Sequence, residues 1–111
     1  MNVLEEIKET VKLEIRPSSI EGEYLEAVVE QKDLDGLLSI LKKHLGTAAK
    51  EPGKVVTLPP PLTKIVEELG GLRTEQTFFY RQESQQITYA ALWPWESNPK
   101  KITLKSGIKK S

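Results

Sequence analysis

The chain has 111 residues, which is the usual size of one domain and too short for two ordinary ones. It contains no cysteine, so disulfides, zinc–thiolate sites, iron–sulfur clusters and thiol nucleophiles are excluded, and the composition fits a reducing cytoplasm. Sixteen basic and 16 acidic residues give zero formal charge, but residues 1–36 hold ten acids and only four bases. The acidic first 36 residues and the basic remainder of the chain can therefore attract each other, or form two faces of opposite sign.

No apolar run approaches the ~20 residues that a membrane-spanning helix needs, and no secretory signal precedes the first charged residues. We therefore expect a cytoplasmic protein that makes no contact with a membrane.

The first element is expected to be a short amphipathic helix. Apolar residues recur at helical spacing from Val3 to Val11, between charged ones, which predicts a helix to about residue 12. Alternation over Val11–Ile15 leaves open an extended end. After Pro17 interrupts the chain, the valine-rich segment Tyr24–Glu30 predicts a strand.

A second helix is predicted over residues 34–45. Its apolar face consists of Leu34, Leu37, Leu38, Leu41 and Leu45. Asp33 has the side chain to cap its first turn, and Gly46 is suited to end it. We expect Leu38 and Leu41 to be buried.

Residues 47–61 are rich in proline and predict a surface connection, with room for a brief strand at Val55–Val56. A third helix is predicted at about residues 61–69, with proline in its first turn and Gly70-Gly71 after its last.

From Leu72 the apolar period changes from about 3.6 to 2, which predicts strands. Three are expected, at Thr74–Arg81, Gln86–Trp93 and Lys101–Ile108, followed by a frayed basic terminus at residues 109–111. Short connections favour an antiparallel meander. The predicted fold is a single α+β domain over residues 1–111. Three amphipathic helices pack on one face of a mainly antiparallel sheet of three or four strands, with the meander at the C-terminus.

No residue can be assigned to catalysis, to a cofactor or to a metal. His44 is the only histidine, and its place near a helix C-terminus favours a capping role over catalysis. The segment Asp33–Gly36 resembles the start of a calcium loop, but the alternate ligand positions fail at Leu37. No glycine-rich phosphate loop occurs. These patterns argue against an enzyme, although carboxylates, lysines or tyrosines from distant positions could still meet in the fold.

Six of the seven aromatic residues fall in the predicted meander. Alternation places Phe78 and Tyr80 on one face of the sheet and Phe79 on the other. Trp93 is expected to point inward, whereas Trp95 lies beyond Pro94 and is free to face a partner. The cluster is either core or contact surface. For a contact surface, the assigned residues are Trp93, Trp95, Tyr80 and Arg81. The preferred hypothesis is a non-enzymatic protein-binding module, or adaptor, that contacts another protein or a second copy of itself.

The alternative hypothesis is a nucleic-acid-binding domain that combines the aromatic strands with lysines near the C-terminus. Those lysines are Lys100, Lys101, Lys105, Lys109 and Lys110. The zero net charge and the acidic first third argue against phosphate binding, and a solvated edge strand also explains the lysines. An enzyme of unidentified reaction is the third hypothesis.

Overall fold

The computed structural model of the protein describes residues 3–54, 57–71, 76–83, 85–95, 97–98 and 100–110. The predicted brief strand at Val55–Val56, the predicted strand start at Thr74 and the terminal Ser111 lie outside these residues. The elements in chain order are α1 (Val3–Thr10), β1 (Glu14–Ile15), β2 (Tyr24–Glu30), the 3-10 helix η1 (Gln31–Asp33), α2 (Leu34–Leu45), α3 (Pro60–Glu68), β3 (Thr77–Glu83), β4 (Gln86–Pro94) and β5 (Lys101–Lys110).

The α+β class and the C-terminal meander are confirmed, but the strand count is wrong. Within the described residues, one sheet has the order β1-β2-β5-β4-β3, with every neighbouring pair antiparallel, and it has five strands instead of three or four. The additional strand is β1, which pairs Glu14 with Val28 and Ile15 with Ala27. The alternation over Val11–Ile15 allows an extended segment here, and the pairing with β2 shows that only its last two residues form a strand.

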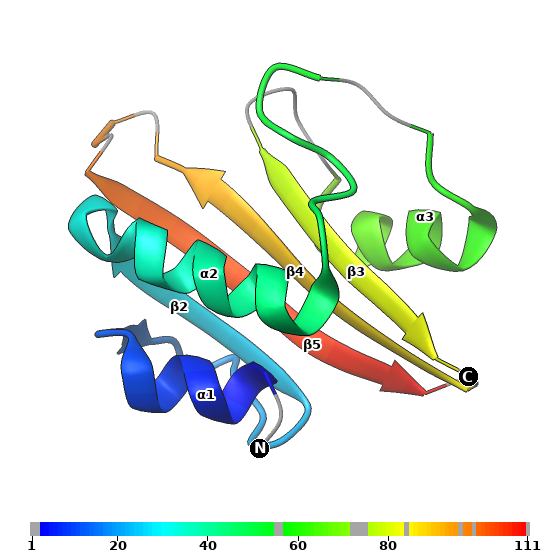
Figure 1. The fold of residues 1–111 in the computed structure, drawn as a ribbon, viewed down its shortest axis with the longest axis horizontal. Coiled ribbons are helices and arrows are strands. Elements are labelled where there is room, and N and C mark those ends of the chain that lie inside the picture. Colours follow the sequence, from blue (N-terminus) through cyan, green and yellow to red (C-terminus); the bar gives the residue numbers. More distant parts are fainter. Residues whose placement is uncertain are drawn as a thin grey trace.

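Helices α1 and α2 cover one face of the sheet and lie in front of it in Figure 1. Their apolar stripes meet the inward residues of four strands. The strand residues of this core are Leu25, Ala27, Val29, Phe79, Ala90, Leu92, Ile102 and Leu104. Leu41 of α2 is fully buried, as expected, whereas Leu38 is only half-buried at the rim of the same cluster. The burial expected for Leu38 is therefore wrong.

Helix α3 packs on the opposite face, so the expectation that all helices share one face is also wrong. Its residues Leu62, Ile65 and Leu69 cluster with Phe78, Ile87, Tyr89 and Ala91 of β3 and β4. The physical reason lies in the central strands, which carry apolar side chains at consecutive positions and therefore on both faces. A sheet with two apolar faces needs a helix layer on each.

Asp33 does not cap α2 with its side chain, contrary to the sequence prediction. The preceding turn of 3-10 helix gives Asp33 a helical backbone, with φ −99° and ψ 0°, and no side-chain hydrogen bond to the helix forms. A capping side chain needs an extended backbone at its own residue, which η1 removes.

Strand β5 extends two residues beyond its predicted end. Lys109 and Lys110 pair with Ile87 and Gln86 of β4. At the far edge of the sheet, the backbone of Lys50 bridges that of Phe78 in β3. This bridge covers part of an otherwise open strand edge.

Candidate functional site

The sheet face that carries α3 is only partly covered, because α3 lies over β3 and β4. The strand register places three outward positions side by side on the remaining part of this face: Val28 of β2, Thr103 of β5 and Trp93 of β4. Trp93, Thr103 and Trp95 are all partly exposed. The two tryptophans of the chain therefore meet around one threonine.

Trp93 sits between the core under α3 and solvent. Its ring packs against the apolar cluster of α3, and the Lys105 ammonium lies 4.9 Å from the ring centroid. The same ammonium donates a hydrogen bond of 3.2 Å to the carbonyl oxygen of Leu69, at the end of α3. A cation is favourable both over an indole and at a helix C-terminus, so Lys105 connects α3 to the indole.

Trp95 follows Pro94 but folds back onto β5. Its backbone N–H donates to the carbonyl oxygen of Lys101 at 3.0 Å, and its indole N–H donates to the Thr103 hydroxyl oxygen at 2.8 Å. The Lys101 ammonium lies 5.6 Å from its ring centroid. The indole is therefore held in one orientation while part of it stays exposed. Trp93, Trp95, Thr103, Lys101 and Lys105 form what we call the indole surface.

The five predicted lysines do not form one basic patch. Lys101, Lys105 and Lys109 share a face by alternation along β5, and Lys110 lies on the other face. Lys109 is neutralised by Glu68 of α3 at 2.7 Å. This lysine holds the pKa of the Glu68 carboxyl below its usual value, chiefly through the hydrogen bond.

Acidic residues lie next to the lysines that remain on the indole surface. Glu26 and Glu30 of β2 are the register partners of Lys105 and Lys101. Because the four side chains alternate onto the same face, this part of the sheet has charges of both signs. Such a face lacks the single-sign field that attracts a phosphate backbone.

Tyr80 and Arg81 are not brought together with the tryptophans. Tyr80 is on the same face, but it packs at the edge of the α3 cluster, with its ring centroid 6.3 Å from that of Phe78. Arg81 points to the opposite face because neighbouring strand residues alternate. The predicted contact residues are thus divided between the indole surface, the α3 cluster and a separate cavity.

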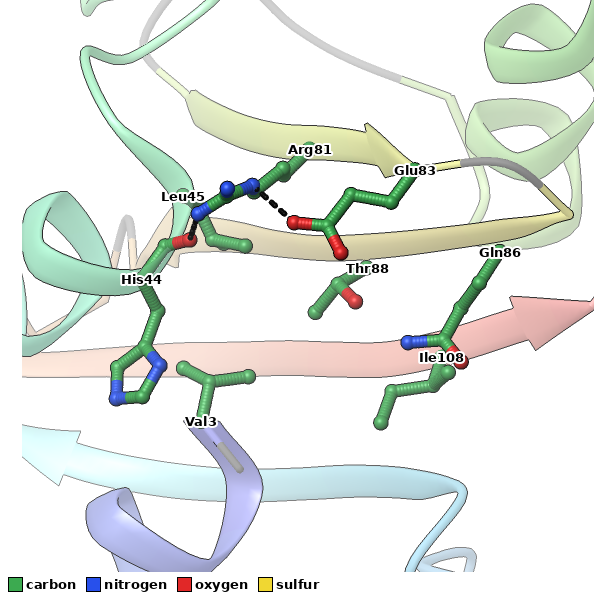
Figure 2. Close-up of a pocket in the computed structure, with 8 residues that line it drawn as sticks. All are labelled: Val3, His44, Leu45, Arg81, Glu83, Gln86, Thr88 and Ile108. Carbon is green, nitrogen blue, oxygen red and sulfur yellow. Dashed lines mark hydrogen bonds and ion pairs between the residues drawn. The ribbon is translucent and has the colours of Figure 1, made fainter. Parts of the chain in front are cut away.

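That cavity, of about 170 Å³, lies between the N-terminus of α1, the C-terminus of α2 and the β3–β4 hairpin (Figure 2). Figure 2 shows the Arg81 guanidinium between the His44 carbonyl oxygen, to which it donates at 3.3 Å, and the Glu83 carboxylate, with which it forms an ion pair. Small-molecule pockets usually have about 300–1,000 Å³, so this cavity is small for a ligand.

The histidine beside this cavity is also engaged within the protein. His44 Nε2 lies 3.1 Å from a Glu6 carboxylate oxygen, and the Lys43 ammonium lies 2.9 Å from the same oxygen. The hydrogen bonds from Lys43 and His44 hold the pKa of the Glu6 carboxyl below its usual value. The arrangement fixes α1 against the end of α2, and it offers no nucleophile paired with a base.

Two tyrosines on the same sheet face as the indole surface remain protonated at neutral pH. Burial, together with the hydrogen bond that its hydroxyl donates to Glu26 at 2.7 Å, raises the pKa of Tyr24. Burial, with a smaller contribution from the Glu68 carboxylate, raises the pKa of Tyr89 to about 12. Neither phenol is poised to transfer protons near neutral pH.

Sequence reasoning missed two residues that shape this face. Thr103 holds the Trp95 indole, and Gly107 lies between Tyr24 and Tyr89 in the register without interrupting it. A Cβ at Gly107 would lie 2.6 Å from the Tyr89 hydroxyl oxygen, so the glycine makes room for this ring. No local pattern marks either role, because both depend on contacts between strands.

Within the described residues, no group of three or more histidine, aspartate and glutamate side chains is arranged to hold a metal ion. No helix in the described part of the chain is long and apolar enough to cross a membrane. Comparison of the chain with protein families, curated proteins and solved structures finds no match.

Proposed function

We propose that the chain is a protein-binding module whose contact site is the indole surface. The observation that carries this proposal is that both tryptophans of the chain lie together, partly exposed, on the part of the sheet face beside α3. Tryptophan is enriched among the residues that dominate binding energy, particularly where polar groups surround it. Here Thr103 and the two lysines supply that polar surround.

The rigidity of Trp95 supports the same function. Its indole is held by the hydrogen bond to Thr103, and its backbone by Lys101. A side chain already held in one orientation loses little conformational entropy when a partner binds, so more of the contact energy appears as affinity.

A protein partner is favoured over a nucleic acid by the charges. The ammonium groups of Lys101 and Lys105 lie over the indole rings on which bases would have to stack. Glu26 and Glu30 are the register partners of these two lysines and would repel a phosphate backbone. We expect binding to single-stranded oligonucleotides at low salt to be absent. Salt-dependent binding that Lys101→Gln and Lys105→Gln together abolish would instead support the nucleic-acid hypothesis.

The test compares three proteins: wild type, Trp95→Ala, and the control Ile15→Ala. Ile15 is a large apolar residue with 52% exposure on β1, away from the indole surface. We expect wild type and the control to retain the same partner, and Trp95→Ala to bind it about 30-fold more weakly. Sedimentation over a range of protein concentrations tests whether that partner is a second copy.

Intrinsic fluorescence gives a direct readout, because Trp93 and Trp95 are the only tryptophans. Binding at the indole surface should change their emission and protect them from acrylamide. A partner that binds all three proteins equally, with unchanged tryptophan quenching, would refute the proposal. The cytoplasm remains the expected location of this interaction.

A further inference from the structure

A groove on the opposite face of the sheet has the features of a ligand site. It has a volume of about 350 Å³ and lies between α2, the segment that follows α2, and the ends of the central strands. We call it the α2 groove and define it by six of its lining residues, Leu38, Lys42, Glu51, Phe79, Leu92 and Ile102. Its volume is within the range of about 300–1,000 Å³ that small-molecule pockets have.

The floor of the groove is apolar and firmly packed. Phe79, Leu92 and Ile102 come from three adjacent strands and are between 1% and 4% exposed. Leu38 forms part of the helix wall and is only half-buried, although it packs against the same core. Its exposed part therefore faces a hollow that an apolar group could fill without rearrangement of the core.

The charged rim of the groove is asymmetric. Lys42 lies one helical turn after Leu38 and is exposed, and its side-chain ammonium has no hydrogen bond or ion pair to any residue that the structure describes. The acidic residue of the rim, Glu51, is already paired with Lys54 at 3.2 Å. An apolar floor with one uncompensated ammonium at its edge is complementary to an apolar molecule that ends in an anion.

We propose that the α2 groove binds a small amphiphilic carboxylate, with its hydrocarbon chain on Phe79, Leu92 and Ile102 and its carboxylate near Lys42. This site is distinct from the indole surface, because Phe79 and Leu92 point to the opposite face from Trp93. The proposal therefore stands or falls independently of the protein-binding function.

The experiment titrates the protein with octanoate, decanoate and decanol, followed by backbone amide chemical shifts. Decanoate should bind about 15-fold more tightly than octanoate, because each buried methylene contributes about a factor of four. The shifts should concentrate on α2 and on the β3, β4 and β5 residues of the floor.

Two variants and one control test the two halves of the site. Lys42→Gln should weaken decanoate about two- to five-fold, the usual contribution of an exposed ion pair, and leave decanol unchanged. Leu38→Trp should fill the groove and weaken both ligands by about ten-fold or more. Lys8→Gln, at an exposed lysine of α1, should change neither.

Several results would overturn the proposal. Absence of saturable decanoate binding at about 1 mM would exclude a ligand site of useful affinity. Equal binding to a folded Leu38→Trp protein would place the ligand elsewhere. Equal losses of decanol and decanoate in Lys42→Gln would refute the role of the carboxylate, and this exposed variant should fold whatever Leu38→Trp does.

Discussion

Replacement of Gly107 by alanine tests the packing of Tyr89 on the sheet face that also carries the indole surface. The added Cβ would lie 2.6 Å from Tyr89 Oη, 2.9 Å from Tyr89 Cζ and 3.1 Å from the Glu23 carbonyl oxygen. The Tyr89 ring is buried and the third atom is backbone, so neither side can move freely. Without the clash, alanine would stabilise a strand interior by about 0.5–1 kcal/mol relative to glycine. Overpacking costs about 1–3 kcal/mol, so we expect a net loss of stability.

The same substitution at Gly36 is the matched control. Gly36 is exposed within α2, and a Cβ there would have no atom within 4 Å. Gly36→Ala should therefore stabilise the protein by about 1 kcal/mol, the helix propensity difference. Both variants can be compared by urea unfolding followed through tryptophan fluorescence. A neutral or stabilising Gly107→Ala would show that Tyr89 does not occupy the space above Gly107, and would refute the reasoning.

Three further predictions concern stability. Trp93→Ala should lower the free energy of unfolding by about 3 kcal/mol, because Trp93 packs on the core. Trp95→Ala should lower it by about 1 kcal/mol, because mainly one hydrogen bond is lost. Equal and large losses from both variants in chemical unfolding would contradict the contact-site role. Leu41→Ala should lower the free energy of unfolding by about 2–5 kcal/mol and Leu38→Ala by about 1–2 kcal/mol, since only Leu41 is fully buried. A larger loss for Leu38→Ala than for Leu41→Ala in urea unfolding would refute the assigned helix face. The pKa of the Tyr89 phenol is raised from 10.0 to about 12 in the folded protein, so the protonated phenol favours the folded state. Its contribution to the free energy of unfolding is therefore complete below pH 10 and is lost as the pH rises towards 12. Tyr89→Phe should flatten this alkaline loss in unfolding measured across that range, and an unchanged slope would contradict the burial of the phenol.

Much of the secondary structure follows from periodicity. The predicted helix at 34–45 and strand at 24–30 have the bounds of α2 and β2. The helix carries five leucines on one face, and the strand carries Leu25, Ala27 and Val29 at a spacing of two together with Val28, so both patterns are strong enough to outweigh local ambiguity. For the two-residue strand β1, the alternation over Val11–Ile15 leaves helix and strand open, and only the pairing with β2 decides between them. The turn of 3-10 helix before α2 has no sequence signal of its own, because Asp33 at its end predicts a helix cap instead.

Side-chain alternation also determined part of the candidate site. It placed Phe78 and Tyr80 on one face and Phe79 on the other, as the two apolar clusters confirm. It also predicted that Trp93 points inward, and Trp93 packs against the cluster of Ile87, Tyr89 and Ala91 under α3. These assignments need only a strand and its period of two, both of which are local properties.

The sequence by itself therefore determined the longer helices and strands, the faces of the strands and the concentration of aromatic residues in the meander. Only the tertiary structure decided that α3 crosses to the second face, that Thr103 holds Trp95, and that Arg81 lies away from both tryptophans. The physical reason is the range of the interactions. Helical and strand periods are set within a few residues. The pairing of β2 with β5 and the packing of α3 on the second sheet face instead join segments that are far apart in the chain. Loop closure and packing of the whole core select these arrangements.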